Sequence, residues 1–285
     1  LCYEEFGDPA GTPLLLIMGL GTQMIGWPDD FCRQLAEQGF RVVRFDNRDS
    51  GRSTHLPGNP PPIGQLIRRR IDPVLYTLSD MAQDARELMR GLDMAPAHVV
   101  GASMGGMIAQ TLAAEHPESV CSLVSIMSNT GSRWLGQPAL GIYRYFLRAA
   151  PSDRDGFIEY TTRVFAAIGS RGLPQDTDRV RDIAARSYDR GHDPAATGRQ
   201  LGAITASGNR TARLRRITVP TLVIHGTTDR MVSPSGGRAT ARAISGAKLL
   251  KIEGMGHDLP EAAWPRLVGA IAQHARAPQG VAAVA

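Results

Sequence analysis

The sequence predicts an α/β protein in which a mostly parallel sheet carries helices on both faces and an inserted helical cap. Short apolar runs such as Leu14–Met18 alternate with helical patterns over the first part of the chain. The alternation stops between residues 131 and 216, where only helical patterns occur, and it returns at Thr221–His225. We therefore expect residues 1–130 and 217–285 to form the α/β core, and residues 131–216 to form a cap or lid.

The core elements have recognisable positions along the chain. Apolar runs predict strands at Leu1–Phe6, Leu14–Met18, Arg41–Phe45, His98–Val100, Val120–Met127, Thr221–His225 and Lys248–Ile252. Helical spacing predicts core helices at Phe31–Gln38, which Gly39 ends, at Leu78–Leu92, which Ser79 caps, and at Ser103–His116 and Glu261–Ala275. In the cap, helical patterns cover Leu140–Leu147, Asp155–Ala167, Thr177–Tyr188 and Ala195–Ala206. The tail from Arg276 to Ala285 is expected to fray.

Composition and charge are those of an ordinary globular protein. The hydrophobic fraction is 42%, the charged fraction is 21% and the net charge is +5. Apart from Arg68–Arg70 and the stretch 210–216, the arginines are scattered among acidic residues. Binding to nucleic acid or to an anionic membrane needs a clustered basic face. We therefore expect no nucleic acid partner and no stable membrane association, with the oligomeric state left open.

Cysteine usage points to a reducing compartment. Cys2, Cys32 and Cys121 are odd in number and far apart, which argues against a disulfide framework and favours a cytoplasmic location. No pairing of Cys or His residues has the spacing of a structural metal site, so we expect no metal. No apolar run at the start is long enough for a membrane span or signal peptide. The chain opens at Leu1, inside a predicted strand, so we expect a short preceding segment, and a removed signal sequence stays open.

A candidate nucleophile lies between a predicted strand and a predicted helix. Residues 101–105 read G-x-S-x-G, with Ser103 in the middle. Glycines on both sides allow a tight turn that presents the serine hydroxyl at the carboxyl end of the sheet. The motif alone is common, and its specificity comes from the strand–turn–helix context. The alternative is a serine that only forms a turn.

Two later loops supply the partners that a nucleophilic serine needs. Asp229 follows the strand at Thr221–His225, and His257 lies in a glycine-rich loop after the last predicted strand. Loops at the carboxyl ends of parallel strands converge at one edge of the sheet. The expected triad is therefore Ser103, His257 as base and Asp229 as the orienting acid. His55 is a rival base, and Asp229 has the alternative role of a turn residue.

An oxyanion intermediate requires backbone donors close to the serine. The N–H of Met104 begins the helix after Ser103, and the N–H of Leu20 belongs to the glycine loop at residues 19–21. We expect these two groups to form the oxyanion hole, with a plain glycine turn as the alternative for residues 19–21.

Aromatic residues in the cap are candidates for a substrate pocket. They are Trp134, Tyr143, Phe146, Tyr160 and Tyr188. Aromatic side chains at helical spacing more often pack helices together than line a pocket, so packing within the cap is the favoured alternative for each of them.

Taken together, these motifs resemble the α/β-hydrolase superfamily, in its branch of capped serine esterases. Residues 45–53 resemble the family's D-x-R-G-x-G-x-S loop, with Asp49 and Ser50 in place of Arg-Gly, and the expected role of this loop is structural. Met18-Gly19, together with residues 26–28, is most similar to aclacinomycin-methylesterase-type hydrolases. The resemblance implies an enzyme that hydrolyses methyl or other small esters.

The expected reaction is a two-step hydrolysis of short- to medium-chain or methyl esters through an acyl-enzyme on Ser103, with no cofactor. Two other acyl-group reactions use the same triad: peracid formation by a cofactor-free perhydrolase, and C–C bond hydrolysis. A further alternative is a non-catalytic receptor that keeps the hydrolase fold and binds a ligand.

Overall fold

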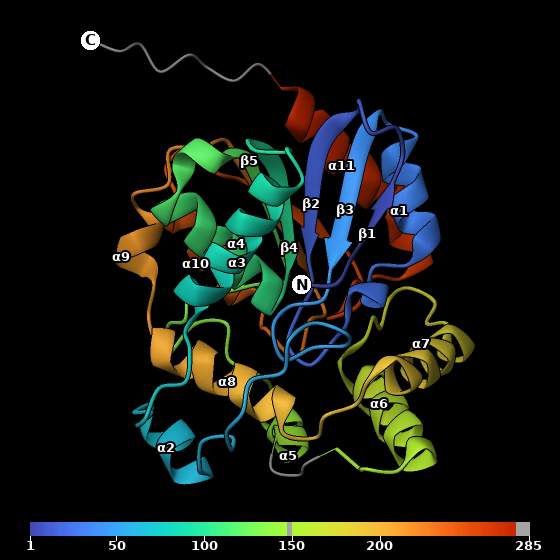
Figure 1. The fold of residues 1–285 in the computed structure, drawn as a ribbon, viewed down its shortest axis with the longest axis vertical. Coiled ribbons are helices and arrows are strands. Elements are labelled where there is room, and N and C mark those ends of the chain that lie inside the picture. The colour runs from blue at the N-terminus through green and yellow to red at the C-terminus, as the bar shows by residue number, and fades with distance from the viewer. Residues whose placement is uncertain (147–149, 278–285) are drawn as a thin grey trace.

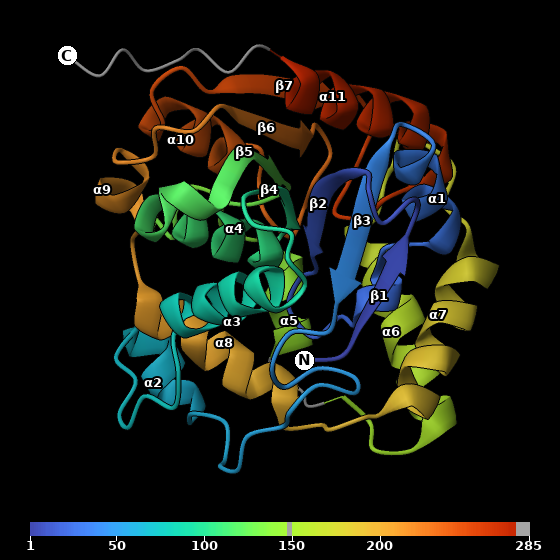
Figure 2. The ribbon, with the colours of Figure 1, turned by 45° about the horizontal axis from the view of Figure 1, so that its top comes forward.

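The strands form one seven-stranded sheet in the order β1-β3-β2-β4-β5-β6-β7 (Figures 1 and 2). The strands are β1 (Tyr3–Phe6), β2 (Thr12–Ile17), β3 (Phe40–Phe45), β4 (Ala97–Ala102), β5 (Val120–Ile126), β6 (Thr221–Gly226) and β7 (Lys248–Ile252). Strand β1 pairs antiparallel with β3, and the remaining neighbours are parallel. The computed structural model describes residues 1–146 and 150–277, except the side chain of Phe146. The predicted fold class is confirmed.

Helices cover both faces of the sheet (Figures 1 and 2). On one face lie α1 (Asp29–Ala36) and α11 (Trp264–Arg276), and on the other lie α3 (Leu78–Gly91), α4 (Met104–Glu115) and α10 (Ser235–Ala243). None of the helices in the described ranges is long and apolar enough to cross a bilayer.

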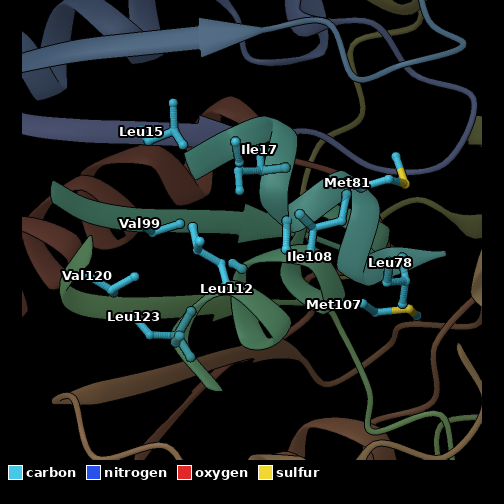
Figure 3. Packing of buried hydrophobic residues seen from close by; sticks show 14 of the residues in the cluster. Leu15, Ile17, Leu78, Met81, Val99, Met107, Ile108, Leu112, Val120 and Leu123 are labelled. Carbon is cyan, nitrogen blue, oxygen red and sulfur yellow. The ribbon is translucent and has the colours of Figure 1, made fainter. Parts of the chain in front are cut away.

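Two apolar clusters fill the spaces between sheet and helices. Strand β2 shows the division: Leu15 and Ile17 belong to the cluster beneath α3 and α4, while Leu14 and Leu16 belong to the cluster beneath α1 and α11. Figure 3 shows Ile17 of β2 near Ile108 of α4, with Leu15 in the same cluster. A strand buried on both faces needs a continuous apolar run, which is why this segment has no polar–apolar alternation.

The described residues between β5 and β6 form helices joined by loops, without a strand. They contain α5 (Tyr143–Phe146), α6 (Arg154–Ile168), α7 (Thr177–Arg190), α8 (Ala196–Ser207) and α9 (Thr211–Leu214). Helices α5 to α8 gather at the end of the molecule where the parallel strands finish (Figures 1 and 2). The assignment of residues 131–216 as a cap or lid stays a prediction.

The structure corrects several details of the expected elements. The cap of α3 is Thr77, whose hydroxyl accepts the Asp80 N–H at 3.4 Å while the Asp80 carboxylate accepts the Thr77 N–H at 2.8 Å. The Ser79 hydroxyl instead donates to Glu115. The helix expected at Leu140–Leu147 is split into a 3-10 turn at Leu140–Ile142 and α5, and Leu147 lies outside the described residues.

Three short helices were not predicted: α2 (Ile63–Arg68), α9 and α10. In α10, two adjacent glycines hide the helical pattern because they lower helix propensity. Both glycines let the helix approach its neighbours: a Cβ on Gly236 would lie 2.9 Å from the Asn129 Cβ, and one on Gly237 would lie 2.5 Å from Nδ1 of His225. Close packing against the sheet therefore stabilises α10 as a helix although its glycines lower the helix propensity.

The three cysteines form no disulfide in the described part of the chain. Cys32 is buried, whereas Cys2 and Cys121 are partly exposed. Burial raises the pKa of the Cys32 thiol to about 12, which keeps it protonated and unreactive.

Glycine substitutions at two helix positions should have opposite effects. A Cβ on Gly105 would lie 2.0 Å from the backbone oxygen of Ile17, whereas a Cβ on Gly91 meets nothing within 4 Å. We expect Gly105→Ala to lower the free energy of unfolding by about 3 kcal/mol. Gly91→Ala should raise it by about 0.5 kcal/mol. Urea unfolding followed by circular dichroism measures both, and equal effects would contradict the close packing of Gly105.

Candidate active site

Ser103 lies on a strained turn between β4 and α4. Its φ is 55° and its ψ is −117°, a combination that few non-glycine residues adopt. The turn fits because the flanking positions are glycine: a Cβ on Gly101 would lie 2.1 Å from the Gly105 oxygen. Strain of this kind persists only where the surroundings enforce it, and a nucleophile exposed at the tip of a strand is a common reason.

Hydrogen bonds from β5 hold the turn in place. The Ser103 N–H donates to the Ile126 oxygen at 2.9 Å, and the Ser128 hydroxyl donates to the Ser103 oxygen at 2.8 Å. Gly106 faces the same Ser128 side chain, because a Cβ there would lie 2.7 Å from the Ser128 Cβ. The serine is thus anchored through its backbone, which leaves its hydroxyl to other partners.

The serine hydroxyl meets a buried histidine and aspartate. Nε2 of His257 lies 2.9 Å from the Ser103 Oγ, and Nδ1 of His257 lies 2.8 Å from Oδ2 of Asp229. The three residues follow β4, β6 and β7, so the convergence of parallel strand ends brings them together. Nδ1 must carry the proton toward the carboxylate, which leaves Nε2 to accept the proton of the serine.

Asp229 remains ionised despite its burial. Burial by itself raises the pKa of this carboxyl group, but the neighbouring His257 and His225 together bring it down to about 2. Its other oxygen, Oδ1, accepts the backbone N–H groups of Met231 and Val232, each at 2.9 Å. The carboxylate is therefore fixed in position and charged across the neutral pH range.

The loop that carries His257 is held by the helical segment above it. The His257 N–H donates to the Ile168 oxygen at 2.9 Å. Ser170 donates from its N–H and its hydroxyl to Asp258, at 3.0 and 2.6 Å, and its hydroxyl accepts the Gly256 N–H at 2.9 Å. These contacts fix the loop on both sides of the histidine. Sequence reasoning missed Ser170, because nothing in the local pattern marks a serine between two helices as a partner of a distant loop.

The glycine loop after β2 lies against Ser103. A Cβ on Gly19 would lie 3.1 Å from the Ser103 Cβ. The Gly21 N–H is already used, since it donates to Oε1 of Gln200 in α8 at 2.9 Å. Within the described chain, no hydrogen bond occupies the N–H of Leu20 or of Met104. Both groups are therefore available to an oxygen near Ser103.

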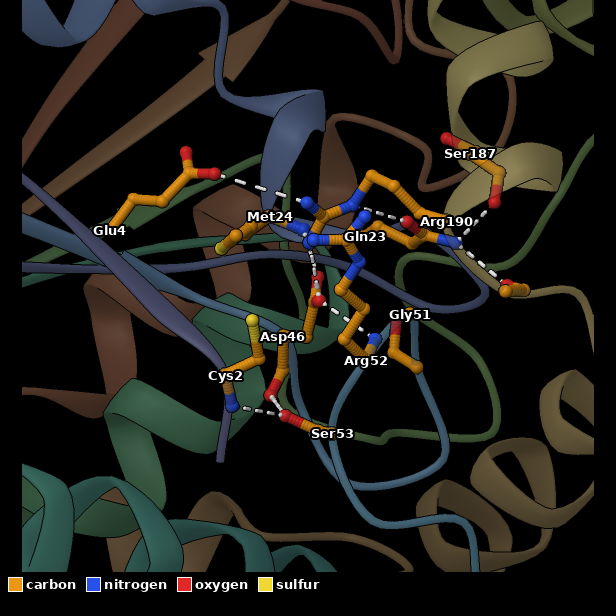
Figure 4. Close-up of polar contacts among 12 residues, drawn as sticks. Cys2, Glu4, Gln23, Met24, Asp46, Gly51, Arg52, Ser53, Ser187 and Arg190 are labelled. Carbon is orange, nitrogen blue, oxygen red and sulfur yellow. Dashed lines mark hydrogen bonds and ion pairs between the residues drawn. The ribbon is translucent and has the colours of Figure 1, made fainter.

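The loop at residues 45–53 supports the glycine loop and its continuation. The Asn47 side chain donates to the Met18 oxygen at 2.9 Å. Figure 4 shows the Asp46 carboxylate at the centre of a polar network in which it accepts the Met24 N–H at 2.7 Å and lies 2.7 Å from the Arg190 guanidinium of α7. Gln23 adds bonds to the backbone oxygens of Ser187 and Gly191. The network ties α7 to the core.

His55, the rival base, has other partners. Its Nδ1 lies 3.3 Å from Asp193 and its Nε2 lies 3.1 Å from the Gly51 oxygen. Asp49, His55 and Asp193 offer ligand atoms within 4.8 Å of one another, a spacing that suits a metal ion. The Arg199 guanidinium, however, donates to both carboxylates and supplies the positive charge that a cation would bring. The geometry therefore gives no support to a metal at this cluster.

The cap aromatics fall into different environments. The Tyr160 hydroxyl donates to the Tyr145 oxygen at 2.8 Å, and the Tyr188 ring stacks on His192 at 5.2 Å, so both pack within the helical segment. Trp134 is 88% exposed and Tyr143 is 41% exposed. The side chain of Phe146 lies outside the described residues. A role for these five residues in lining a pocket stays a prediction.

Sheet order, strained serine turn and converging loops together define an α/β hydrolase. Residues 12–261 match the sequence profile of the alpha/beta hydrolase fold family, and the chain belongs to that family. Among its relatives is the rhodomycin D methylesterase DnrP of Streptomyces peucetius, 30% identical over 97% of this chain and 95% of the relative. Another is the putative non-heme bromoperoxidase BpoC of Mycobacterium tuberculosis, 27% identical over 90% of each chain. The crystal structure of the enol-lactonase from Burkholderia xenovorans LB400 superposes with a TM-score of 0.74 over 96% of this chain and 95% of that chain, at 24% identity.

Removal of the Ser170 hydroxyl should loosen the histidine loop. We expect Ser170→Ala to lower kcat for p-nitrophenyl acetate about tenfold with little change in KM, because His257, the predicted base, is displaced while the substrate contacts stay. Ser152→Ala, an exposed serine of the same segment, is the matched control and should leave both constants unchanged. A rise in KM at constant kcat would contradict a role of Ser170 in positioning the base.

Proposed function

We propose that the protein is a serine hydrolase of carboxylic esters, and that Ser103, His257 and Asp229 form its catalytic triad. The observation that carries the proposal is the continuous path from the Ser103 hydroxyl through His257 to Asp229, with contacts of 2.9 and 2.8 Å. The strained backbone at Ser103 and the ionised, buried Asp229 support it. The likeness to a rhodomycin D methylesterase over nearly the whole chain also supports ester hydrolysis.

In the first half of the reaction, the Ser103 Oγ attacks the acyl carbon while Nε2 of His257 takes the hydroxyl proton. Asp229 stabilises the imidazolium that forms, and the N–H groups of Leu20 and Met104 bind the oxyanion. The ester C–O bond breaks, the alcohol leaves with the proton from His257, and an acyl-serine remains.

In the second half, water takes the place of the alcohol. His257 removes a proton from the water as it attacks the acyl carbon, and the same proton returns to Ser103 when the acid departs. These steps need only protein side chains, backbone donors and water. The substrates that we propose are methyl esters or other esters of small alcohols, in line with the methylesterase relative.

Loss of the nucleophile should abolish turnover. We expect Ser103→Ala to lower kcat on p-nitrophenyl esters from acetate to octanoate by at least about 10⁴-fold, and to abolish labelling by a fluorophosphonate probe. Ser245→Ala, at an exposed turn, is the control and should match the parent protein. Parental rates in the Ser103→Ala protein would refute the proposal.

The charge of Asp229 should persist over the pH range of the assays. With a pKa of about 2, Asp229 stays charged at every pH where the enzyme is assayed, so its own protonation should not set the acid limb of kcat/KM. Asp229→Asn removes that charge and favours the wrong tautomer, and we expect kcat to fall about 10³- to 10⁴-fold. Full activity of Asp229→Asn would assign the orienting role to another group.

A further inference from the structure

A second histidine lies against the proposed catalytic aspartate. His225 is the penultimate residue of β6 and is 2% exposed. Its Nε2 lies 2.8 Å from the Val232 oxygen and 3.3 Å from Oδ2 of Asp229, the same oxygen that His257 contacts. The Asp229 carboxylate therefore lies between two imidazole rings, and the reaction described above uses only one of them.

The protonation of His225 follows from its contacts. Nε2 faces two acceptors, a carbonyl and a carboxylate, so this nitrogen carries a hydrogen. Nδ1 is buried and has no hydrogen-bond partner in the described residues, and Gly237 of α10 packs directly against it. A proton on Nδ1 would leave a buried N–H without an acceptor, which is costly. His225 is therefore the neutral Nε2–H tautomer.

Charged and titratable groups of the neighbouring elements surround His225. Asp229 and His257 lie on its Nε2 side. Arg238 of α10 and Lys251 of β7 line the same small cavity as His225.

Because Nε2–H is shared, His225 acts on the aspartate in two ways. Its main bond fixes the Val232 oxygen, and the N–H of the same Val232 holds Oδ1 of Asp229, so His225 stabilises the turn that presents the carboxylate. Its N–H dipole also faces Oδ2 at 3.3 Å and offsets part of the negative charge that His257 experiences.

We propose that His225 is a positioning residue for the triad, which holds Asp229 in place and shares with His257 the carboxylate oxygen Oδ2 of Asp229. This inference rests on the proposed function, since it assigns His225 a role in the same reaction. Without the N–H of His225, the full charge of Asp229 would act on His257 and favour its protonated form.

The test compares two substitutions of His225. His225→Leu keeps the volume and removes the donor, whereas His225→Gln retains an N–H donor of similar reach. For His225→Leu, we expect the acid limb of kcat/KM on p-nitrophenyl acetate to move upward by about 0.5 to 1 pH unit, and the plateau to fall about tenfold. His225→Gln should restore the parental position of the acid limb and most of the plateau.

A matched control separates this effect from the loss of any buried histidine. His98 in β4 is 6% exposed, and its Nδ1 lies 2.8 Å from the Ser122 hydroxyl. His98→Leu should lower the thermal stability but leave the acid limb unchanged. If His225→Leu lowers the plateau without moving the acid limb, or if His225→Gln shifts it as far as His225→Leu does, the inference is wrong.

Fluorophosphonate labelling of the parent protein distinguishes this failure from failure of the proposed function. Labelling at Ser103 with an unmoved acid limb in His225→Leu would reject the inference and keep the hydrolase. No labelling of the parent protein would reject both.

Discussion

The site depends on the close contact of backbone segments around Ser103. The serine can adopt its left-handed conformation because the first turn of α4 packs against β2 and β4 with no side chain between them, at Gly101 and Gly105. That contact also brings the loop after β2 within reach of the serine, so the same glycines that permit the turn bring close the N–H groups that we propose as oxyanion donors. The close packing at Gly101 and Gly105 thus fixes the turn of Ser103, the proposed nucleophile, and the position of the N–H groups that would bind the oxyanion.

Electrostatic interactions stabilise the second part of the site, which contains Asp229 and His257. Asp229 is a buried anion, and its burial is tolerated because two backbone N–H groups and two imidazoles surround it. The histidine loop is held from two sides. Thr227 and Thr228, after β6, bond to Gly254 and Met255, while Ser170 and Ile168 of the helical segment bond to residues 256–258. Both the sheet domain and the segment between β5 and β6 therefore contribute to the position of His257, the proposed base.

The elements that depend on local sequence patterns could be predicted from the sequence alone. The seven strands, the elbow at Ser103 and the loops of Asp229 and His257 were all found from periodicity, glycine placement and chain order. Contacts between distant segments could not be predicted: Ser170 bonds to Asp258 only because the tertiary structure brings the two segments together. The contact of His225 with Asp229 is local, but it depends on the conformation of the turn after β6, which the sequence pattern does not specify. Helix α10 was missed for a related reason, since its glycines lower the helical signal and gain their value from packing on the sheet.

The hydrogen bonds between residues 168–172 and the histidine loop have a consequence for how such proteins diversify. The residues between β5 and β6 are those that we predict to form a cap over the site. They also help to hold the loop of His257, the proposed general base, through the oxygen of Ile168 and the hydroxyl of Ser170. A replacement of the segment between β5 and β6 that changes the shape of the substrate site should therefore keep activity only if the new segment brings an equivalent short stretch of chain to the histidine loop. A change in substrate specificity and the retention of the reaction are therefore linked through the contact between residues 168–172 and the histidine loop.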